Sequence, residues 1–262
     1  MHSHHEEAIA NLVQRFECDG EVVALILAGS VARGAEREDS DIDAMVVVTD
    51  EKLAALAREG RLSETIREGC AYEGGYFDLK YCTIDYLQKA AAVGSEPSRN
   101  AFRGARCLYT KMPEVPFFVA QIPVFQTNEK AEKMLSFYSA FALNARYLWR
   151  VAQGERYLQH RAAGDMVLFG LRMVLQESEV LFPCQRRLMQ TVAALDKDTV
   201  SLLEAANRFL TEMNDAAKES FEAALFALLE YQAPERFSVV LSAFVADNEL
   251  WWYKQRPVIA EW

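Results

Sequence analysis

The chain has 262 residues, and its content of 51% hydrophobic and 25% charged residues is typical of a globular protein and excludes a disordered one. Its 28 basic and 38 acidic residues give a formal net charge of −10, which disfavours a nucleic acid partner because phosphate backbones are bound largely through Lys and Arg. An acidic chain suits a cationic small molecule or a protein partner, and no membrane partner is expected because no apolar run approaches the ~20 residues that cross a bilayer.

The first part of the chain is predicted to alternate between helices and strands. Apolar residues at helical spacing indicate helices over residues 6–17, 51–57 and 61–70. Apolar runs rich in β-branched or aromatic residues indicate strands over residues 22–28, 42–48 and 76–83. In the third strand Asp78 and Lys80 share one face, because side chains alternate with a period of two. We expect this polar face to line a cleft.

Beyond about residue 90 the pattern becomes mainly helical. A helix is predicted over 97–106, a short strand over 107–110, and an irregular segment over 112–123, which contains three prolines. Apolar stripes then predict helices over 128–151, 157–176, 183–195, 199–215, 217–231 and 234–253. The expected architecture is an α/β domain at residues 1–110, with a mixed sheet and flanking helices, followed by an all-α helical bundle at residues 111–262.

A glycine–serine turn follows the first predicted strand. Glycine at position 29 lets the backbone turn sharply and lets a phosphate approach the main chain. If Ser30 begins a helix, its N–H groups and its hydroxyl point toward an anion. Gly34 would keep the next turn open, and Arg33 and Arg37 are close enough in sequence to contact phosphates. The residues after this strand therefore indicate a phosphate-binding turn.

Two carboxylates begin the second predicted strand. Asp41 and Asp43 are two residues apart, so their side chains project to the same side and repel each other unless a cation lies between them. Mg²⁺ is the natural candidate, since it binds carboxylate and phosphate oxygens together. A glycine–serine turn or a pair of acids is common when either occurs alone. Both together, each joined to an apolar strand, indicate a site for a nucleoside triphosphate and its metal ions.

A third carboxylate on a neighbouring strand would complete a two-metal site. Asp78 is the best candidate because it lies on the polar face of the third predicted strand. Glu73 and Asp85 compete for this role but lie outside that strand, and the alternative for Asp78 is an exposed residue paired with Lys80. In such a site one metal lowers the pKa of the attacking hydroxyl, and the other neutralises the leaving pyrophosphate.

The segment GSVARGAEREDSDID, residues 29–43, resembles the nucleotidyltransferase superfamily. This superfamily includes DNA polymerase beta, the kanamycin and streptomycin nucleotidyltransferases and the small minimal nucleotidyltransferases of prokaryotes. The shared pattern is present here as Gly29, Ser30, Gly34, Ser40, Asp41, Asp43 and Asp78. The resemblance covers about residues 8–85, and the helical remainder is more loosely similar to the C-terminal domain of antibiotic nucleotidyltransferases.

The resemblance implies metal-dependent, in-line transfer of a nucleoside monophosphate, with ATP as the default donor and two Mg²⁺ ions as cofactors. The residues that would bind the nucleotide are Gly29, Ser30, Arg33, Gly34 and Ser40. The residues that would hold metal and act in catalysis are Asp41, Asp43 and Asp78. Asp78 would also help to deprotonate the acceptor hydroxyl.

The acceptor is expected to be a small hydroxyl-bearing molecule, such as an aminoglycoside- or lincosamide-like antibiotic. This expectation rests on the resemblance and on the acidic balance of the chain. One alternative is transfer onto a protein, as in toxin–antitoxin systems, and another is a catalytically weak NTP-binding protein of the same fold. The motif residues do not define the base preference, the acceptor or the oligomeric state.

The cysteines and the N-terminal residues bear on the cellular compartment. The five cysteines are scattered without CxxC spacing, which indicates reduced thiols, and the first residues lack the basic start and apolar centre of a signal peptide. A cytoplasmic protein is therefore expected. Three early histidines, His2, His4 and His5, are expected to lie on a mobile terminus with incidental affinity for metals.

Overall fold

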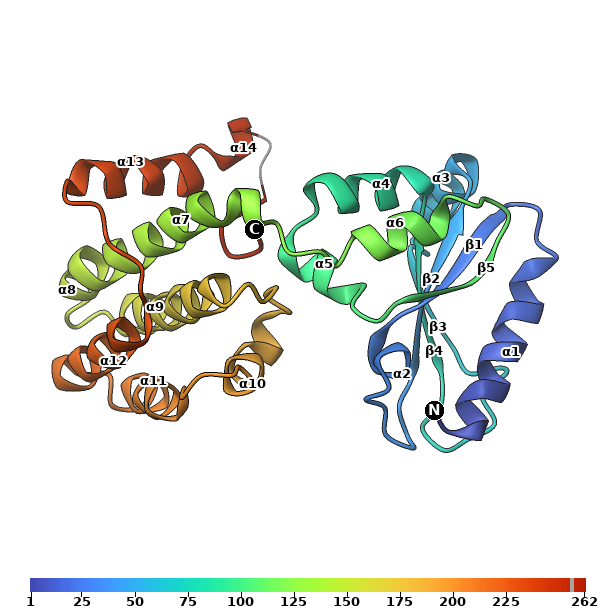
Figure 1. Cartoon of the computed structure of the whole chain (residues 1–262), viewed down its shortest axis with the longest axis horizontal. Coiled ribbons are helices and arrows are strands. Elements are labelled where there is room, and N and C mark those ends of the chain that lie inside the picture. Colours follow the sequence, from blue (N-terminus) through green and yellow to red (C-terminus); the bar gives the residue numbers. More distant parts are fainter. Residues whose placement is uncertain (255–256) are drawn as a thin grey trace. The chain divides into compact units, whose positions relative to one another are not determined.

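The computed structural model describes residues 1–254 and 257–262, and these form two compact units (Figure 1). The first unit, Met1–Val124, contains a β-sheet with flanking helices, and the second, Phe125–Trp262, is built from helices. The predicted fold class, an α/β domain followed by an all-α domain, is confirmed. The first unit extends past the expected boundary at residue 110.

One mixed sheet of five strands, in the order β3-β4-β2-β1-β5, forms the centre of the first unit. The strands are β1 (Val22–Leu27), β2 (Ile42–Val48), β3 (Ser63–Ile66), β4 (Phe77–Cys82) and β5 (Arg106–Thr110). β2 and β4 are parallel, and the other neighbouring pairs are antiparallel. β1 and β2 lie in the interior of the sheet and are covered on both faces, which is why their sequences are continuously apolar.

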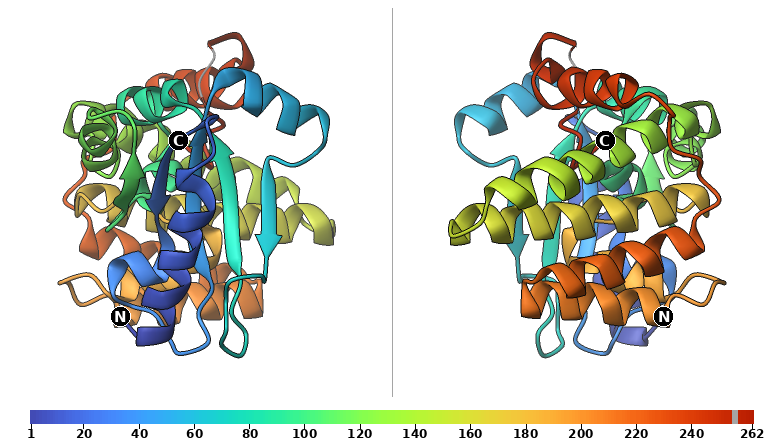
Figure 2. Two further views of the ribbon diagram at one scale, coloured as in Figure 1. Left: turned by 90° about the vertical axis from the view of Figure 1, so that its right-hand side faces the viewer. Right: turned by 90° about the vertical axis from the view of Figure 1, so that its left-hand side faces the viewer.

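Helices cover the two faces of this sheet. Helix α1 (Ser3–Glu17) buries Leu12 and Phe16 against one face, and Figure 2 (left) shows this helix in front of the strands. Helices α4 (Ile84–Val93) and α6 (Val115–Gln121) pack against the other face. The remaining helices of this unit are α2 (Gly29–Arg33), α3 (Asp50–Arg58) and α5 (Glu96–Ala101). The sheet thus holds the turn after β1 and the starts of β2 and β4 in fixed positions.

The segment predicted as a helix over residues 61–70 instead contains β3, the edge strand of the sheet. Its residues alternate between exposed and half-buried, with Glu64 and Ile66 facing inward. Ile66 pairs with Phe77 and Ser63 with Lys80 along β4, which leaves these backbone groups hydrogen-bonded in a ladder. The helical prediction was wrong because pairing with β4 outweighs local propensity in so short a segment.

The segment predicted to be irregular, residues 112–123, contains helix α6. Pro116 lies in the first turn, where no backbone N–H is needed for the helix, so this proline favours the start of a helix. Val115, Val119 and Ile122 follow at helical spacing and are buried against the sheet. Because α6 packs against β5 and α4, it belongs to the first unit.

The second unit is helical throughout, as the apolar stripes predicted. Its elements are η1 (Thr127–Glu129), α7 (Lys130–Leu143), the π-helical turn η2 (Asn144–Leu148), α8 (Trp149–Val151), α9 (Arg156–Glu177), η3 (Gln185–Arg187), α10 (Leu188–Ala193), α11 (Val200–Glu212), α12 (Asp215–Leu228), α13 (Phe237–Asn248) and α14 (Trp251–Lys254). Helices α7 and α9 run side by side (Figure 2, right). Helix α9 contributes the largest run of buried residues to the core.

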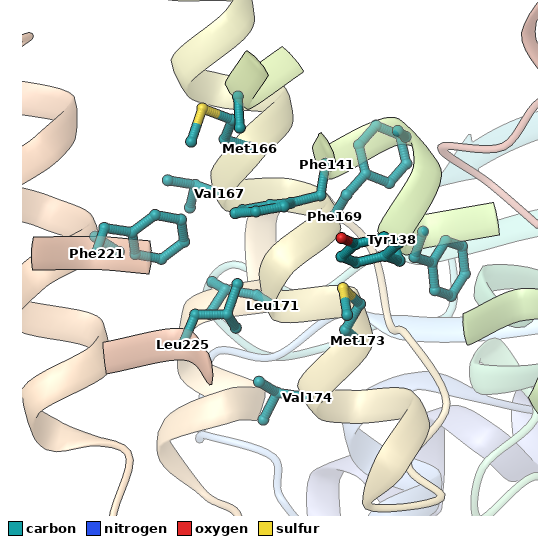
Figure 3. Packing of buried hydrophobic residues seen from close by; sticks show 14 of the residues in the cluster. Tyr138, Phe141, Met166, Val167, Phe169, Leu171, Met173, Val174, Phe221 and Leu225 are labelled. Atoms are coloured by element: carbon teal, nitrogen blue, oxygen red, sulfur yellow. The ribbon is translucent and has the colours of Figure 1, made fainter. Parts of the chain in front are cut away.

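Close packing between α9 and α12 depends on a glycine in α9. Figure 3 shows Phe221 and Leu225 of α12 pointing toward the side chains of α9. A Cβ atom on Gly170 would lie 2.9 Å from Leu225 and 3.2 Å from Phe221. The missing side chain therefore lets the two helices approach closely, although glycine lowers the intrinsic stability of a helix.

A buried arginine joins α9 to the last residues of the chain. Arg172 is fully buried, and its guanidinium lies between the rings of Phe137 and Phe182, 4.2 Å from each centroid. It donates hydrogen bonds to the backbone carbonyl of Ala260, at 3.0 Å, and to that of Trp262. A buried guanidinium needs such acceptors, so this contact fixes residues 260–262 on the helical core.

No helix in the described part of the chain is long and apolar enough to span a bilayer. All five cysteines are free thiols, which agrees with the expectation drawn from their spacing.

We predict that Arg172→Met lowers the free energy of unfolding by about 3 kcal/mol, because two backbone carbonyls lose a charged donor. Urea unfolding followed by circular dichroism measures this change. Arg208→Met is the matched control, since Arg208 is half-exposed on α11 and pairs only with Glu212 at 3.6 Å, and it should change the unfolding free energy by less than about 1 kcal/mol. Equal effects of the two substitutions would contradict the anchoring role of Arg172.

Candidate active site

The turn between β1 and α2 brings the main chain against a carboxylate. Gly29 has φ of +69°, and a Cβ atom there would lie 1.8 Å from Oδ2 of Asp43. The N–H of Ala28 donates to the backbone oxygen of Asp43 at 2.9 Å, which holds the two segments together. Only glycine provides both the backbone conformation and the space at position 29. The Asp43 side chain therefore packs directly onto the backbone at the start of α2.

The second glycine of the motif ends α2. Gly34 has φ of +67°, and its N–H donates to the carbonyl of Val31 at 3.3 Å. The N–H of Ala35 donates to the carbonyl of Ser30 at 3.0 Å, which completes the helix end. A Cβ atom at position 34 would meet nothing within 4 Å. Gly34 is thus needed for its conformation and not for space.

Ser40 shapes the loop that precedes the two aspartates. Its hydroxyl accepts a hydrogen bond from the N–H of Arg37 at 2.9 Å, and its N–H donates to the Arg37 carbonyl at 3.1 Å. The hydroxyl of Tyr72 donates to the Ser40 carbonyl at 2.8 Å. Ser40 is buried, so its hydroxyl supports the loop conformation.

The N-terminal residues also hold this loop. Helix α1 begins at Ser3, and the ring of His4 bonds to the carbonyl of Glu38 at 3.0 Å. The Met1 ammonium group lies 3.4 Å from Glu36. His5 is fully buried, and its ring packs edge-on against Tyr72. The structure therefore differs from the expectation of a mobile terminus, because α1 orders these residues from Ser3 onward.

Two of the three predicted acids lie side by side on neighbouring strands. Asp43 of β2 pairs in register with Asp78 of β4, and Asp41 directly precedes β2. Burial raises the pKa of Asp43, and the neighbouring carboxylates of Asp41 and Asp78 raise it further. Lys80 and Arg33 lie close enough to lower it in part. The site therefore holds more negative charge than its own cations neutralise.

A small hollow opens beside this carboxylate pair. It has a volume of about 100 Å³, and its polar lining comes from Arg33, Asp43, Asp78 and Lys80, with Gly29 at the floor. This volume is below the ~300 Å³ typical of small-molecule sites, so it suits an ion or a phosphate group and not a whole nucleotide. Of the predicted site residues, Ser30, Gly34, Ser40 and Asp41 lie on the adjoining turn and loop and not in the lining.

Two residues outside the motif also lie at this site: Tyr76, which directly precedes β4, and Lys80 of β4. The hydroxyl of Tyr76 lies near the carboxylate of Asp41, and this negative neighbour raises the pKa of Tyr76. The Lys80 ammonium lies 3.5 Å from Oδ2 of Asp78, as in the pairing considered as the alternative for that aspartate. Period-two alternation does place Tyr76, Asp78 and Lys80 on one face, so the signal for both residues was present in the sequence.

The donor set fits Mg²⁺ in chemistry but is not arranged as a metal cage. Among residues 1–254 and 257–262, no three His, Cys, Asp or Glu side chains are grouped so that they could hold a metal ion. Asp78 pairs with Lys80, which keeps this carboxylate on a protein partner. The excess negative charge around Asp43 is what a divalent cation would relieve. Binding would require Asp78 to exchange Lys80 for the ion.

Comparison with known proteins agrees with this geometry. A family model described as a nucleotidyltransferase domain matches residues 7–86, which include the glycine–serine turn and all three aspartates. The first unit therefore contains a nucleotidyltransferase domain, and the resemblance to this superfamily is confirmed. Among solved structures, the nucleotidyltransferase-like protein from Exiguobacterium sibiricum is similar, with 12% identity and a TM-score of 0.47 over 96% of this chain and 92% of that chain. None of the curated proteins matches the chain.

We predict a larger loss of stability for Gly29→Ala than for Gly34→Ala. Both glycines have nearly the same positive φ, so both variants incur the backbone cost of about 1–2 kcal/mol. Only Gly29→Ala also drives a methyl group into Asp43, which adds about 1–3 kcal/mol. Unfolding free energies in urea measure the difference. Equal losses for the two variants would mean that Asp43 does not pack on Gly29.

The raised pKa of Asp43 predicts a pH-dependent gain of stability in Asp43→Asn. The folded protein disfavours the ionised carboxylate, so wild type should be less stable than this variant above the folded pKa. The difference in stability between wild type and variant should shrink as the pH falls through that pKa, and it should vanish below the ordinary value of 3.8. The free energies of unfolding of both proteins, determined in EDTA between about pH 3.5 and 8, measure this difference.

Asp39→Asn provides a control of opposite sign for that experiment. A hydrogen bond from Arg37 lowers the pKa of Asp39, so removing its charge should destabilise the protein above the ordinary pKa of 3.8. The loss should fade as the pH drops through the folded pKa. If Asp43→Asn destabilises the protein, as Asp39→Asn should, the electrostatic account of the site is wrong.

Proposed function

We propose that this protein transfers a nucleoside monophosphate, AMP from ATP, to a hydroxyl group of a small molecule. The observation that carries the proposal is the packing of Asp43 on Gly29, with Asp78 opposite in register, inside a nucleotidyltransferase domain. This packing puts an exposed turn of main chain beside a concentration of negative charge. A triphosphate and divalent cations complement those two features.

The residues of the site take distinct parts in this proposal. The backbone N–H groups and the Ser30 hydroxyl at the start of α2 bind phosphate oxygens, and Arg33 adds a positive charge beside them. Asp41, Asp43 and Asp78 would hold Mg²⁺, which would supply charge neutralisation at the pyrophosphate and acidify the acceptor hydroxyl. The Asp78 carboxylate accepts the proton of that hydroxyl.

The proposed acceptor is a hydroxyl-bearing and cationic small molecule, of the kind represented by aminoglycoside- and lincosamide-like antibiotics. The formal net charge of −10 supports a cationic acceptor over an anionic one, because the field of the chain attracts cations. The loose resemblance of the helical sequence to the C-terminal domain of antibiotic nucleotidyltransferases favours the same class of acceptor.

One observation favours a second candidate, a catalytically weak NTP-binding protein. Asp78 is paired with Lys80 of β4, so metal binding at Asp78 must compete with a lysine ammonium. A site with weakened metal affinity would bind nucleotide and turn over slowly. Modification of a protein hydroxyl is the remaining alternative, and it needs no change in the residues of the site.

We predict that Mg²⁺ and ATP together raise the melting temperature by about 5 °C or more, and that neither does so alone. A ligand at ~100 times its Kd stabilises the native state by about 2.7 kcal/mol. Asp41→Asn combined with Asp43→Asn should abolish the joint shift, measured by differential scanning fluorimetry. Asp39→Asn is the matched control, since Asp39 is in the same loop but bonds to Arg37, and it should keep the shift. A shift that survives the double substitution would show that the assigned metal site is wrong.

Pyrophosphate release separates the candidate functions. The wild-type chain with Mg²⁺ and ATP should release pyrophosphate with members of a panel of aminoglycosides and lincosamides. Release only with purified proteins would favour protein modification. Joint stabilisation by Mg²⁺ and ATP without release with any acceptor would favour the weak NTP-binding protein.

A further inference from the structure

The second unit contains a pocket to which nucleotidyl transfer assigns no role. It has a volume of about 500 Å³, which is within the range typical of small-molecule sites. Helix α13 packs along α7 (Figure 1), and the pocket lies where the first turns of α13 approach the end of α7 and the helical turns that follow it. The residues that line it are Leu143, Arg146, Tyr147, Arg150, Phe237 and Leu241.

Much of the apolar wall of this pocket is open to solvent. Tyr147, Phe237 and Leu241 remain 53%, 40% and 44% exposed, whereas Leu143 is buried. Removing apolar surface of this kind from water is favourable, roughly in proportion to the area covered. The walls therefore favour a ligand that has an aromatic or aliphatic body.

Two arginines carry the charge of the described lining, and no carboxylate accompanies them there. The guanidinium of Arg146 lies 5.4 Å from the centroid of the Phe237 ring, so it reaches from η2 to α13. Arg150 lies four residues further along the same wall, and both arginines are exposed. Within residues 1–254 and 257–262, neither guanidinium forms an ion pair with a carboxylate. Like charges this close on a helix repel each other, and an anion bound between them relieves that repulsion.

The backbone of the arginine-bearing wall departs from a regular helix. Arg146 and Tyr147 belong to the π-helical turn η2, which joins α7 to α8. Such turns are rare, and they occur frequently at functional sites. The local backbone thus agrees with a binding role for this wall.

We propose that this pocket binds a small organic anion, a carboxylate attached to an aromatic or aliphatic body. The carboxylate accepts hydrogen bonds from the guanidinium groups of Arg146 and Arg150, whose planar fork matches its geometry. The body of the ligand packs on Tyr147, Phe237 and Leu241. A neutral analogue keeps the apolar contacts and loses the charged hydrogen bonds, and a cationic analogue is repelled by both arginines.

The size and charge of the pocket favour a small molecule over a second copy of this chain. The described lining amounts to six residues, whereas a stable protein interface takes about 20–30 residues from each partner. Two copies also repel each other, because each carries a formal net charge of −10. A small carboxylate fills the pocket without either difficulty.

This site is independent of the proposed function. It uses residues of the second unit alone, and no residue assigned to nucleotide or metal contributes to it. Binding can therefore be measured in EDTA, without nucleotide. The variant combining Asp41→Asn and Asp43→Asn should bind the carboxylate as wild type does, so failure of one proposal does not imply failure of the other.

The test compares three probes of similar shape by isothermal titration calorimetry on the full chain at neutral pH. The probes are 1-naphthylacetate, which is anionic, 1-naphthylacetamide, which is neutral, and 2-(1-naphthyl)ethylamine, which is cationic. We expect the carboxylate to bind at least about tenfold more tightly than the amide, and the amine not to bind. Equal affinities for carboxylate and amide, or no binding of the carboxylate, would overturn the proposal.

The variant Arg150→Gln tests the charged part of the site. It should weaken the binding of 1-naphthylacetate at least about fivefold and leave that of 1-naphthylacetamide nearly unchanged, because it removes a charged donor that only the carboxylate uses. Arg208→Gln is the matched control, since Arg208 lies on α11 outside the lining, and it should leave both affinities unchanged. Unchanged carboxylate affinity in a folded Arg150→Gln variant would overturn the assignment.

The variant Leu241→Gln tests the apolar part. It should weaken the binding of carboxylate and amide together, because both probes use the same wall, and unchanged affinities would overturn the assignment. Size-exclusion chromatography of wild type and Leu241→Gln decides whether a second copy covers the pocket instead. A wild-type dimer that this substitution converts into a monomer would overturn the proposal. If Leu241→Gln fails to fold, Arg150→Gln decides.

Discussion

The contact between the main chain at Gly29 and the carboxylate of Asp43 determines the character of the first unit. Antiparallel pairing of β1 with β2 brings the two residues together, and the bond from Ala28 to the backbone of Asp43 fixes their separation. Because position 29 has no side chain, Asp43 can lie in a partly dehydrated place beside Asp78. Every electrostatic feature of the site follows from this placement, including the raised pKa of Asp43 and its attraction for cations.

The second unit relies on buried polar groups of a different kind. Arg172 donates to two carbonyls and lies between two aromatic rings, and it secures residues 260–262 on the helical core. Asn144, by contrast, keeps one amide oxygen without a partner in the described structure. A satisfied buried group stabilises a single conformation, whereas an unsatisfied one lowers the stability of the fold.

Local spacing was sufficient to predict the strands that carry Asp43 and Asp78, and Asp41 directly precedes the first of them. It failed for β3 and α6: an edge strand depends on pairing with β4, and a proline favours a helix only when it falls in the first turn. The pairing of Asp78 with Lys80 was considered as an alternative to metal binding, because alternation places both residues on one face without saying which interaction will form.

The loop between α2 and β2 is held at several points before any ligand arrives. Met1 pairs with Glu36, His4 bonds to the carbonyl of Glu38, and Tyr72 bonds to that of Ser40. A loop restrained in this way has already lost most of its conformational entropy when the chain folds. Association with a triphosphate then needs no slow ordering step, so its rate should be governed by diffusion and ionic strength.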